Sequence, residues 1–112
     1  MTYEDFVSIA LEFPGVSEEP RKEGSSVTRE GQSMFWLKKW ELLCIKMSWA
    51  EIDEKLEGYP EVLYTTPHFN GYPALHANLE LLSPELAKEL IQLSWDDAPN
   101  KVKFRRQPKA KL

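Results

Sequence analysis

The chain has 112 residues, of which 42% are hydrophobic and 29% are charged, so we expect one globular domain and exclude a disordered chain. Cys44 is the only cysteine, which excludes an intrachain disulfide and a zinc site built from several thiolates. No apolar run reaches membrane-spanning length, and acids stand where a signal peptide carries bases. We therefore expect a cytoplasmic protein that has no membrane partner.

The charge of the chain is unevenly distributed around its net value of −4. Residues 101–112 hold six of the 14 basic residues and none of the 18 acidic ones, so they carry +6 and residues 1–100 carry −10. A body this acidic repels phosphate backbones, whereas the basic tail attracts them. The tail thus favours nucleic acid as a partner, and the body does not.

The first helix is predicted from Thr2 to about Phe13. Thr2 and Asp5 resemble a capping box, and apolar side chains follow at helical spacing. Pro14-Gly15 ends this helix. Residues 17–26 mix charged and small side chains without a usable period, so we expect a loop with at most one short edge strand.

Three strands are predicted next. Residues 27–29 and 33–37 form a hairpin across the glycine-containing loop 30–32, and residues 42–47 form the third strand. Alternation places Met34 and Trp36 on one face of the second strand, and Phe35 and Leu37 on the other. Since the two longer strands are partly apolar on both faces, we expect central strands covered by helices on at least one side.

The second helix has the clearest signal, because Ser48 and Glu51 form a capping box and Gly58 with Pro60 marks the end. A short strand over residues 62–64 and a turn-rich loop over 65–72 follow. An alternating strand is expected over residues 73–80.

The third helix begins after Ser83, with Pro84 at its first position, and ends at residues 98–100. We expect Trp49 and Trp95 to fill the core from the second and third helices. Short hairpin connections with helices at the ends indicate an α+β fold: a two-layer, mainly antiparallel sheet packed against about three helices. Residues 1–100 are expected to form the single domain, and residues 101–112 a basic, flexible tail.

No catalytic constellation is recognisable in the sequence. His68 and His76 are the only histidines, and neither stands in a metal-binding or paired-carboxylate spacing, so we interpret both as structural. Cys44 lies in an apolar run and is expected to be a small buried side chain and not a reactive thiol. We therefore expect no enzyme activity, no metal and no cofactor.

One group of candidate binding residues is basic. Trp40 follows two lysines, and an aromatic ring beside lysines can stack a base while the ammonium groups hold phosphates. The alternative for Trp40 is to cap a turn. The nucleic-acid-binding candidates, which include the start of the basic tail, are Lys38, Lys39, Lys101, Lys103, Arg105 and Arg106.

A second group lies in the loop over residues 66–73, where turn formers and aromatics are densest. Asn70-Gly71 is a strong turn signal, and loops held by a rigid scaffold often carry binding residues. The alternative is a tightly built loop with a structural role only. The candidates for contact with a protein partner or a small ligand are His68, Phe69, Asn70, Gly71 and Tyr72.

Three stretches also carry a family resemblance that covers about residues 3 to 100. They are Thr66-Pro67-His68-Phe69-Asn70-Gly71-Tyr72-Pro73, the turn Phe13-Pro14-Gly15-Val16-Ser17-Glu18, and the hairpin from Gly31 to Trp36. Together they resemble the MmcQ/YjbR-like family. The resemblance implies a compact α+β domain that binds DNA through a double-wing surface, with no established catalytic residue or cofactor.

The chain departs from the family pattern at two places. Many members have a basic residue about where Asn78 stands, and a lysine in the hairpin where Gln32 or Ser33 stands. Both departures remove cations from strand faces that would meet phosphate.

Overall fold

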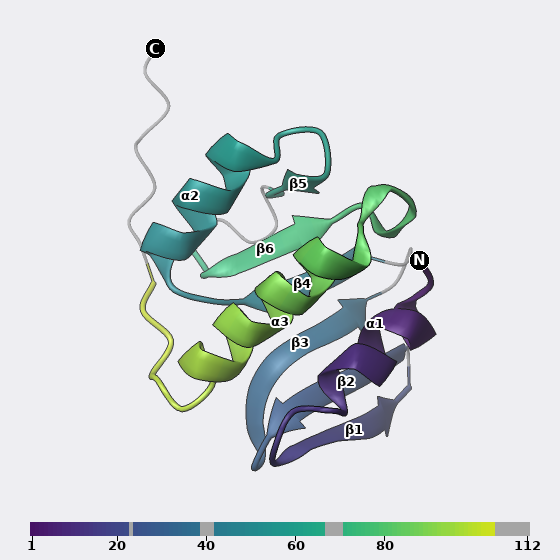
Figure 1. The fold of residues 1–112 in the computed structure, drawn as a ribbon. Helices are drawn as coiled ribbons and strands as arrows, with labels where there is room; N and C mark the ends of the chain where they lie inside the picture. Colours follow the sequence, from purple (N-terminus) through teal and green to yellow (C-terminus); the bar gives the residue numbers. More distant parts are fainter. Residues whose placement is uncertain (23, 39–41, 67–70, 105–112) are drawn as a thin grey trace.

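The computed structural model describes residues 1–22, 24–38, 42–66 and 71–104. Within them, one antiparallel sheet has the strand order β1-β2-β3-β4-β6-β5 (Figure 1). The strands are β1 (Val16–Arg21), β2 (Gly24–Arg29), β3 (Gln32–Lys38), β4 (Leu42–Lys46), β5 (Leu63–Tyr64) and β6 (Ala74–Ala77). In the part of the chain that the structure describes, three α-helices accompany the sheet: α1 (Tyr3–Ala10), α2 (Trp49–Gly58) and α3 (Pro84–Asp97). The predicted α+β fold with an antiparallel sheet is confirmed.

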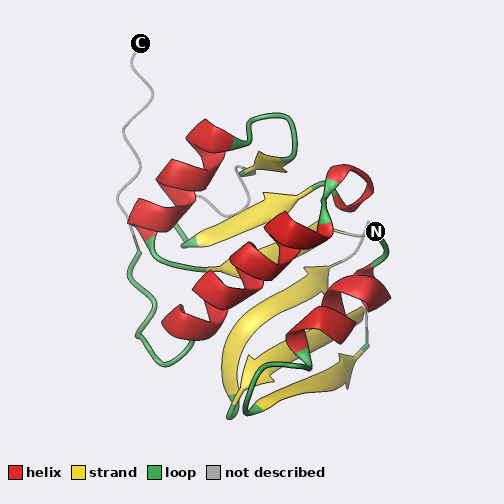
Figure 2. Cartoon of the chain, in the orientation of Figure 1, coloured by secondary structure: helices red, strands yellow, loops and turns green. Residues whose placement is uncertain are grey.

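Helices α1 and α3 lie side by side on one face of the sheet, with α3 over β3 and β4 (Figures 1 and 2). Helix α2 packs beside β5, at the other end of the sheet from β1. We call the face under α1 and α3 the helix face, and the other side of the sheet the opposite face. No helix in the described part of the chain is both long and apolar enough to cross a membrane.

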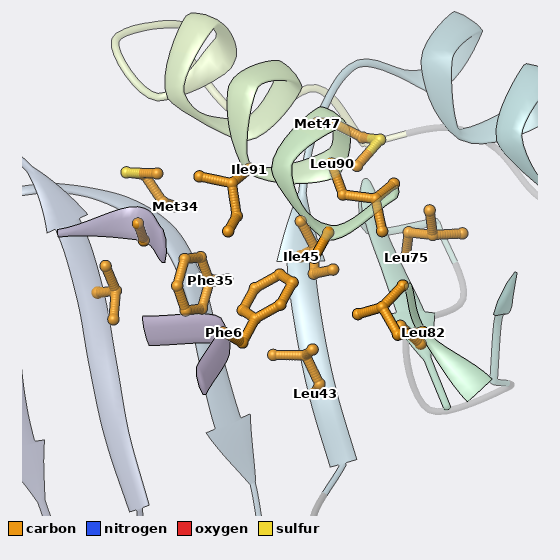
Figure 3. Packing of buried hydrophobic residues seen from close by; sticks show 14 of the residues in the cluster. Phe6, Met34, Phe35, Leu43, Ile45, Met47, Leu75, Leu82, Leu90 and Ile91 are labelled. Atoms are coloured by element: carbon orange, nitrogen blue, oxygen red, sulfur yellow. The ribbon is translucent and has the colours of Figure 1, made fainter. Parts of the chain in front are cut away.

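The hydrophobic core fills the space between the helix face and the helices (Figure 3). Phe6 of α1 meets Phe35 of β3 edge to face, with ring centroids 4.8 Å apart. Cross-strand pairing aligns Val27, Phe35, Ile45 and Leu75 into one row across four strands, and all four side chains are fully buried. Removing large apolar side chains from water in this way is the main source of stability for such a domain.

Local capping defines where the helices begin. Thr2 and Ser48 each form the predicted capping box, with Asp5 and Glu51 respectively. Ser83 accepts a hydrogen bond from the backbone of Leu86, which confirms the predicted start of α3. Each such cap contributes about 1 kcal/mol to helix stability. The hairpin loop is shorter than predicted, because only Glu30 and Gly31 lie outside the strands.

The segment over residues 17–26 was expected to be mostly loop, and this expectation was wrong. It holds most of β1 and the first part of β2. Strand β1 is an edge strand whose last five residues are all exposed, so it shows no apolar alternation. Pro20 is compatible with this strand. Proline has no backbone N–H to donate, and an edge strand tolerates that loss.

The predicted alternation along β3 holds for Phe35, Trp36 and Leu37 but is wrong for Met34. Val27 pairs with Phe35 and Thr28 pairs with Ser33, so Met34 is the extra residue of a β-bulge. The bulge interrupts the period of two, and Met34 and Phe35 both lie fully buried in the same core cluster. The hydroxyl of Ser94 on α3 donates a hydrogen bond of 2.8 Å to the Met34 carbonyl.

The strand expected over residues 73–80 is shorter than predicted. Strand β6 ends at Ala77, and Leu79–Leu81 form a short 3-10 helix. The side chain of Asn78 accepts from the backbone N–H of Glu80, as an N-cap does, and so ends the strand.

Trp49 and Trp95 lie at the margin of the core and do not fill it. Both are partly buried, and each indole N–H donates to a backbone carbonyl: Trp49 to Lys103 at 2.7 Å, and Trp95 to Pro14 at 2.9 Å. An indole that keeps its polar end at the surface satisfies its donor without burying it. Trp40 lies outside the described residues.

Candidate nucleic-acid interface

A row of four residues crosses the opposite face of the sheet. Trp36 pairs with Cys44, Cys44 with His76, and His76 with Tyr64. Because side chains alternate along a strand, this row faces away from the core. Cys44 and His76 are fully buried, whereas Trp36 is half-buried and Tyr64 is 40% exposed. The row therefore has a buried centre and aromatic ends.

His76 fixes the start of the loop over residues 66–73. Its Nδ1 lies 3.0 Å from the carbonyl oxygen of Leu43, and its Nε2 lies 3.2 Å from the hydroxyl of Thr66. A carbonyl oxygen can only accept, so Nδ1 donates to Leu43; in the neutral ring Nε2 then accepts from the hydroxyl of Thr66. These contacts agree with the structural role that the sequence suggested for His76.

Cys44 is buried, as predicted. Its Sγ donates a long hydrogen bond of 3.7 Å to the carbonyl oxygen of Leu42. Burial raises the pKa of the thiol to about 12, and the positive charge of Lys38 lowers this pKa by a smaller amount. Since the thiolate is the nucleophilic form, this side chain is unreactive near neutral pH.

The described residues contain no group of three or more His, Cys, Asp or Glu side chains placed to hold a metal ion.

Three aromatic rings connect the predicted binding loop to the basic segment. Trp36 and Tyr72 meet edge to face with centroids 6.1 Å apart, and Tyr72 meets Phe104 edge to face at 5.5 Å. We call Trp36, Tyr72 and Phe104 the aromatic cluster. The loop and the tail were weighed as separate candidate sites, yet the structure places Tyr72 of one against Phe104 of the other.

Tyr72, the middle ring of the aromatic cluster, and Phe104, one of its outer rings, differ in exposure. Phe104 is 73% exposed, the largest value among the exposed large hydrophobic side chains of the described residues. Tyr72 is half-buried, and burial, followed by the charge of Asp97, raises the pKa of its hydroxyl. Tyr72 is therefore the ring that packs against the protein, and Phe104 is the ring that meets solvent.

A buried lysine holds the segment that follows α3. The ammonium group of Lys46, at the end of β4, donates to the carboxylate of Asp97 at 2.6 Å, and to the carbonyl oxygens of Asp97 and Asn100. Both side chains of the ion pair are largely buried. A cation at the C-terminus of a helix also interacts favourably with the helix dipole. This contact ties the end of α3 to the sheet.

A second contact holds the segment three residues further on. The indole N–H of Trp49, at the start of α2, donates to the carbonyl oxygen of Lys103. The chain after α3 accordingly runs past the start of α2 (Figure 1). Residues 101–104 are thus held at Lys103 by Trp49 and at Phe104 by Tyr72.

A groove of about 370 Å³ lies between the start of α2 and this segment. Lys101 and Lys103, two of the predicted nucleic-acid-binding residues, line it and are exposed. Neither forms an ion pair with another described residue. The other lining residues are Met47, Ser48, Trp49, Pro73, Asp97, Asn100 and Val102.

Among the candidate nucleic-acid-binding residues that the structure describes, Lys38 lies apart from Lys101 and Lys103. It pairs with Leu42 at the first residue of β4, whereas the tail is tied to Lys46 at the last residue. Four residue steps along a strand span about 13 Å. Trp36 belongs to the same face and pairs with the middle of β4, so the aromatic cluster begins between Lys38 and the tail.

Of the predicted loop residues, the structure describes only the last two. Gly71 is buried and has a φ of +83°, a backbone conformation that glycine adopts without strain. Tyr72 joins the aromatic cluster. The remaining predicted site residues, Lys39, His68, Phe69, Asn70, Arg105 and Arg106, lie outside the described residues.

Sequence reasoning missed three functional candidates: Trp36, Trp49 and Phe104. Phe104 stands between Lys103 and Arg105, and this interleaving of an aromatic with bases was a usable signal. Trp49 carried a weaker signal. Its indole N–H needs a hydrogen-bond acceptor wherever it is buried.

Comparison of the chain with protein-family models, with curated proteins and with solved structures gave no match.

Proposed function

We propose that this chain is an MmcQ/YjbR-like domain that binds DNA and catalyses no reaction. The observation that carries the proposal is the pair of exposed lysines, Lys101 and Lys103, held on an anchored backbone beside the solvent-exposed ring of Phe104. The α+β fold agrees with the fold that the family resemblance implies. Lys39, Arg105 and Arg106 are proposed as further cations of this interface, and Lys38, at the opposite end of β4 from the tail, would extend it along the sheet.

Electrostatics favour this surface over the rest of the molecule. Residues 101–112 carry +6 and residues 1–100 carry −10, so a phosphate backbone is attracted to one end of the chain only. Asp97, the acid that lines the groove, is paired with Lys46. Its charge is therefore compensated locally, and it opposes the approach of a phosphate less than an unpaired carboxylate would.

The proposal is tested by fluorescence anisotropy with labelled oligonucleotides at several salt concentrations. Affinity should fall steeply with salt, because each neutralised phosphate releases counterions. The double variant Lys101→Gln/Lys103→Gln should bind more weakly and should reduce the slope of log K against log salt by roughly 1.5 to 2. No binding of any DNA at low salt would refute the proposal.

A matched control separates the site from net charge. Lys22 and Lys88 are also exposed lysines of the described chain; Lys22 lies in the turn directly after β1, and Lys88 lies on α3. The variant Lys22→Gln/Lys88→Gln removes the same charge and should leave the salt slope unchanged. Equal losses in the two double variants would show that net charge alone attracts the DNA.

A second candidate function is a protein-interaction or small-ligand module that uses the loop over residues 66–73. The groove of about 370 Å³ favours it, because Pro73 at the end of this loop lines the groove together with the apolar side chains of Met47 and Trp49. A partner captured by the wild type but lost with Tyr72→Ala, and retained by Lys101→Gln/Lys103→Gln, would support this candidate over DNA binding.

A further inference from the structure

Phe104 has an exposure that folding does not explain. It is 73% exposed, although burying a phenylalanine side chain stabilises a protein by about 1.5–3 kcal/mol. The ring is nevertheless positioned, because Tyr72 contacts it and Trp49 holds the carbonyl of the preceding residue, Lys103. A single exposed apolar side chain needs no explanation, but Phe104 continues a row of aromatic side chains, and contiguous apolar surface of this kind is typical of a binding site.

The geometry of the aromatic cluster leaves ring surface for stacking. The planes of Tyr72 and Phe104 are inclined by 76°. In such an edge-to-face pair, one ring presents an edge and keeps both of its faces, and the other loses only one face. Phe104 therefore has at least one open face, in keeping with its exposure.

Cations stand beside this open ring. Lys101 and Lys103 are exposed on the same segment, with Cα atoms that can be at most about 7 Å apart. Proteins that bind single-stranded nucleic acid combine these two features: aromatic rings that stack on bases, and ammonium groups that follow the backbone. In a duplex the base faces are already stacked on one another, so an open ring face has nothing to contact without unstacking.

Helices α1 and α3 do not offer the usual alternative, a helix placed in the major groove. Helices α1 and α3 pack on the helix face, and α1 carries the acids Glu4 and Asp5 in its first turn with no base in its last. The lysines and the exposed ring instead lie on the segment after α3.

From these observations we infer that the aromatic cluster binds single-stranded DNA, with a base stacked on Phe104 and neighbouring phosphates held by Lys101 and Lys103. This inference rests on the proposed DNA binding and names its ligand. Stacking is tolerant of sequence because every base has a flat face, so the preference is for strandedness and not for a base order.

The test compares fluorescein-labelled dT12 with the dT12·dA12 duplex by anisotropy, for the wild type, Phe104→Leu and Phe104→Tyr. The single strand should bind the wild type at least tenfold more tightly than the duplex. Phe104→Leu keeps an apolar side chain but removes the aromatic face, and should weaken dT12 binding roughly 5- to 150-fold. Phe104→Tyr keeps the face and should retain affinity.

Salt dependence separates stacking from charge. Phe104→Leu should weaken dT12 binding by the same factor at every salt concentration, since it removes no cation. Lys101→Gln/Lys103→Gln should instead change the slope. Circular dichroism should show all variants folded, because Phe104 lies at the surface.

The possible failures are distinguishable. If the duplex binds as tightly as dT12, or if Phe104→Leu binds dT12 like the wild type, the inference is overturned while DNA binding stands. If neither DNA binds, the proposed function itself fails, and the inference fails with it.

Discussion

The two faces of the sheet are built differently. On the helix face, Phe6 and Phe35 pack inside a continuous apolar core beneath α1 and α3. On the opposite face, buried polar groups such as His76 and Lys46 hold Thr66 and the segment after α3, and aromatic rings remain partly exposed. Stability should therefore depend mainly on the helix face, and binding on the opposite face and the segment beside it.

The largest expected effect comes from two phenylalanines that differ in burial. Phe35→Ala should reduce the free energy of unfolding by about 3–5 kcal/mol, because it leaves a cavity in the core. Phe104→Ala should change it by only about 0.5 kcal/mol or less, because the ring is already largely in water. Urea unfolding followed by circular dichroism measures both.

A conservative variant protects this comparison against a protein that does not fold. Phe35→Leu keeps most of the side-chain volume and should cost about 1.5 kcal/mol or less. Equal losses for Phe35→Ala and Phe104→Ala would contradict the assignment of stability to the helix face.

The next effect concerns the buried ion pair between Lys46 and Asp97. Asp97→Ala leaves the Lys46 ammonium group buried with only carbonyl partners, and should cost about 3 kcal/mol in urea unfolding. The double variant Lys46→Met/Asp97→Ala removes the uncompensated charge and should recover part of this loss. A double variant that is less stable than Asp97→Ala would show that Lys46 does not depend on this carboxylate.

Signals carried by neighbouring residues were sufficient to predict most of the fold. The capping boxes at Thr2 and Ser48 need only three residues of spacing, and both are present. The antiparallel arrangement followed from short connections. Strand β1 escaped prediction because an exposed edge strand has no apolar alternation, and the bulge at Met34 escaped because a period of two contains no sign of an inserted residue.

The candidate site was less predictable because it depends on contacts between distant parts of the chain. The sequence did identify the lysines at 101 and 103, since a run of bases is visible locally. The contact between Lys46 and Asp97, which anchors the segment after α3, joins residues 51 apart, and no pattern in the sequence predicts it. The contact between Tyr72 and Phe104 also joins distant residues. The sequence therefore predicted the loop and the tail as two separate candidate sites.

The smallest expected effect tests how well the centre of the opposite face is shielded from water. Burial raises the pKa of Cys44 from its ordinary value of 9.0 to about 12, so the folded state keeps the thiol protonated at a pH where the unfolded chain ionises. The thiol therefore contributes stability that is complete below about pH 9 and is lost as the pH rises toward 12. Tyr3 and Tyr72, whose pKa values are also raised, act in the same direction, but both remain in Cys44→Ala. Urea unfolding at pH 8.5, 10 and 11 should show a steeper alkaline loss for the wild type than for Cys44→Ala, whereas parallel curves would mean that water reaches the sulfur.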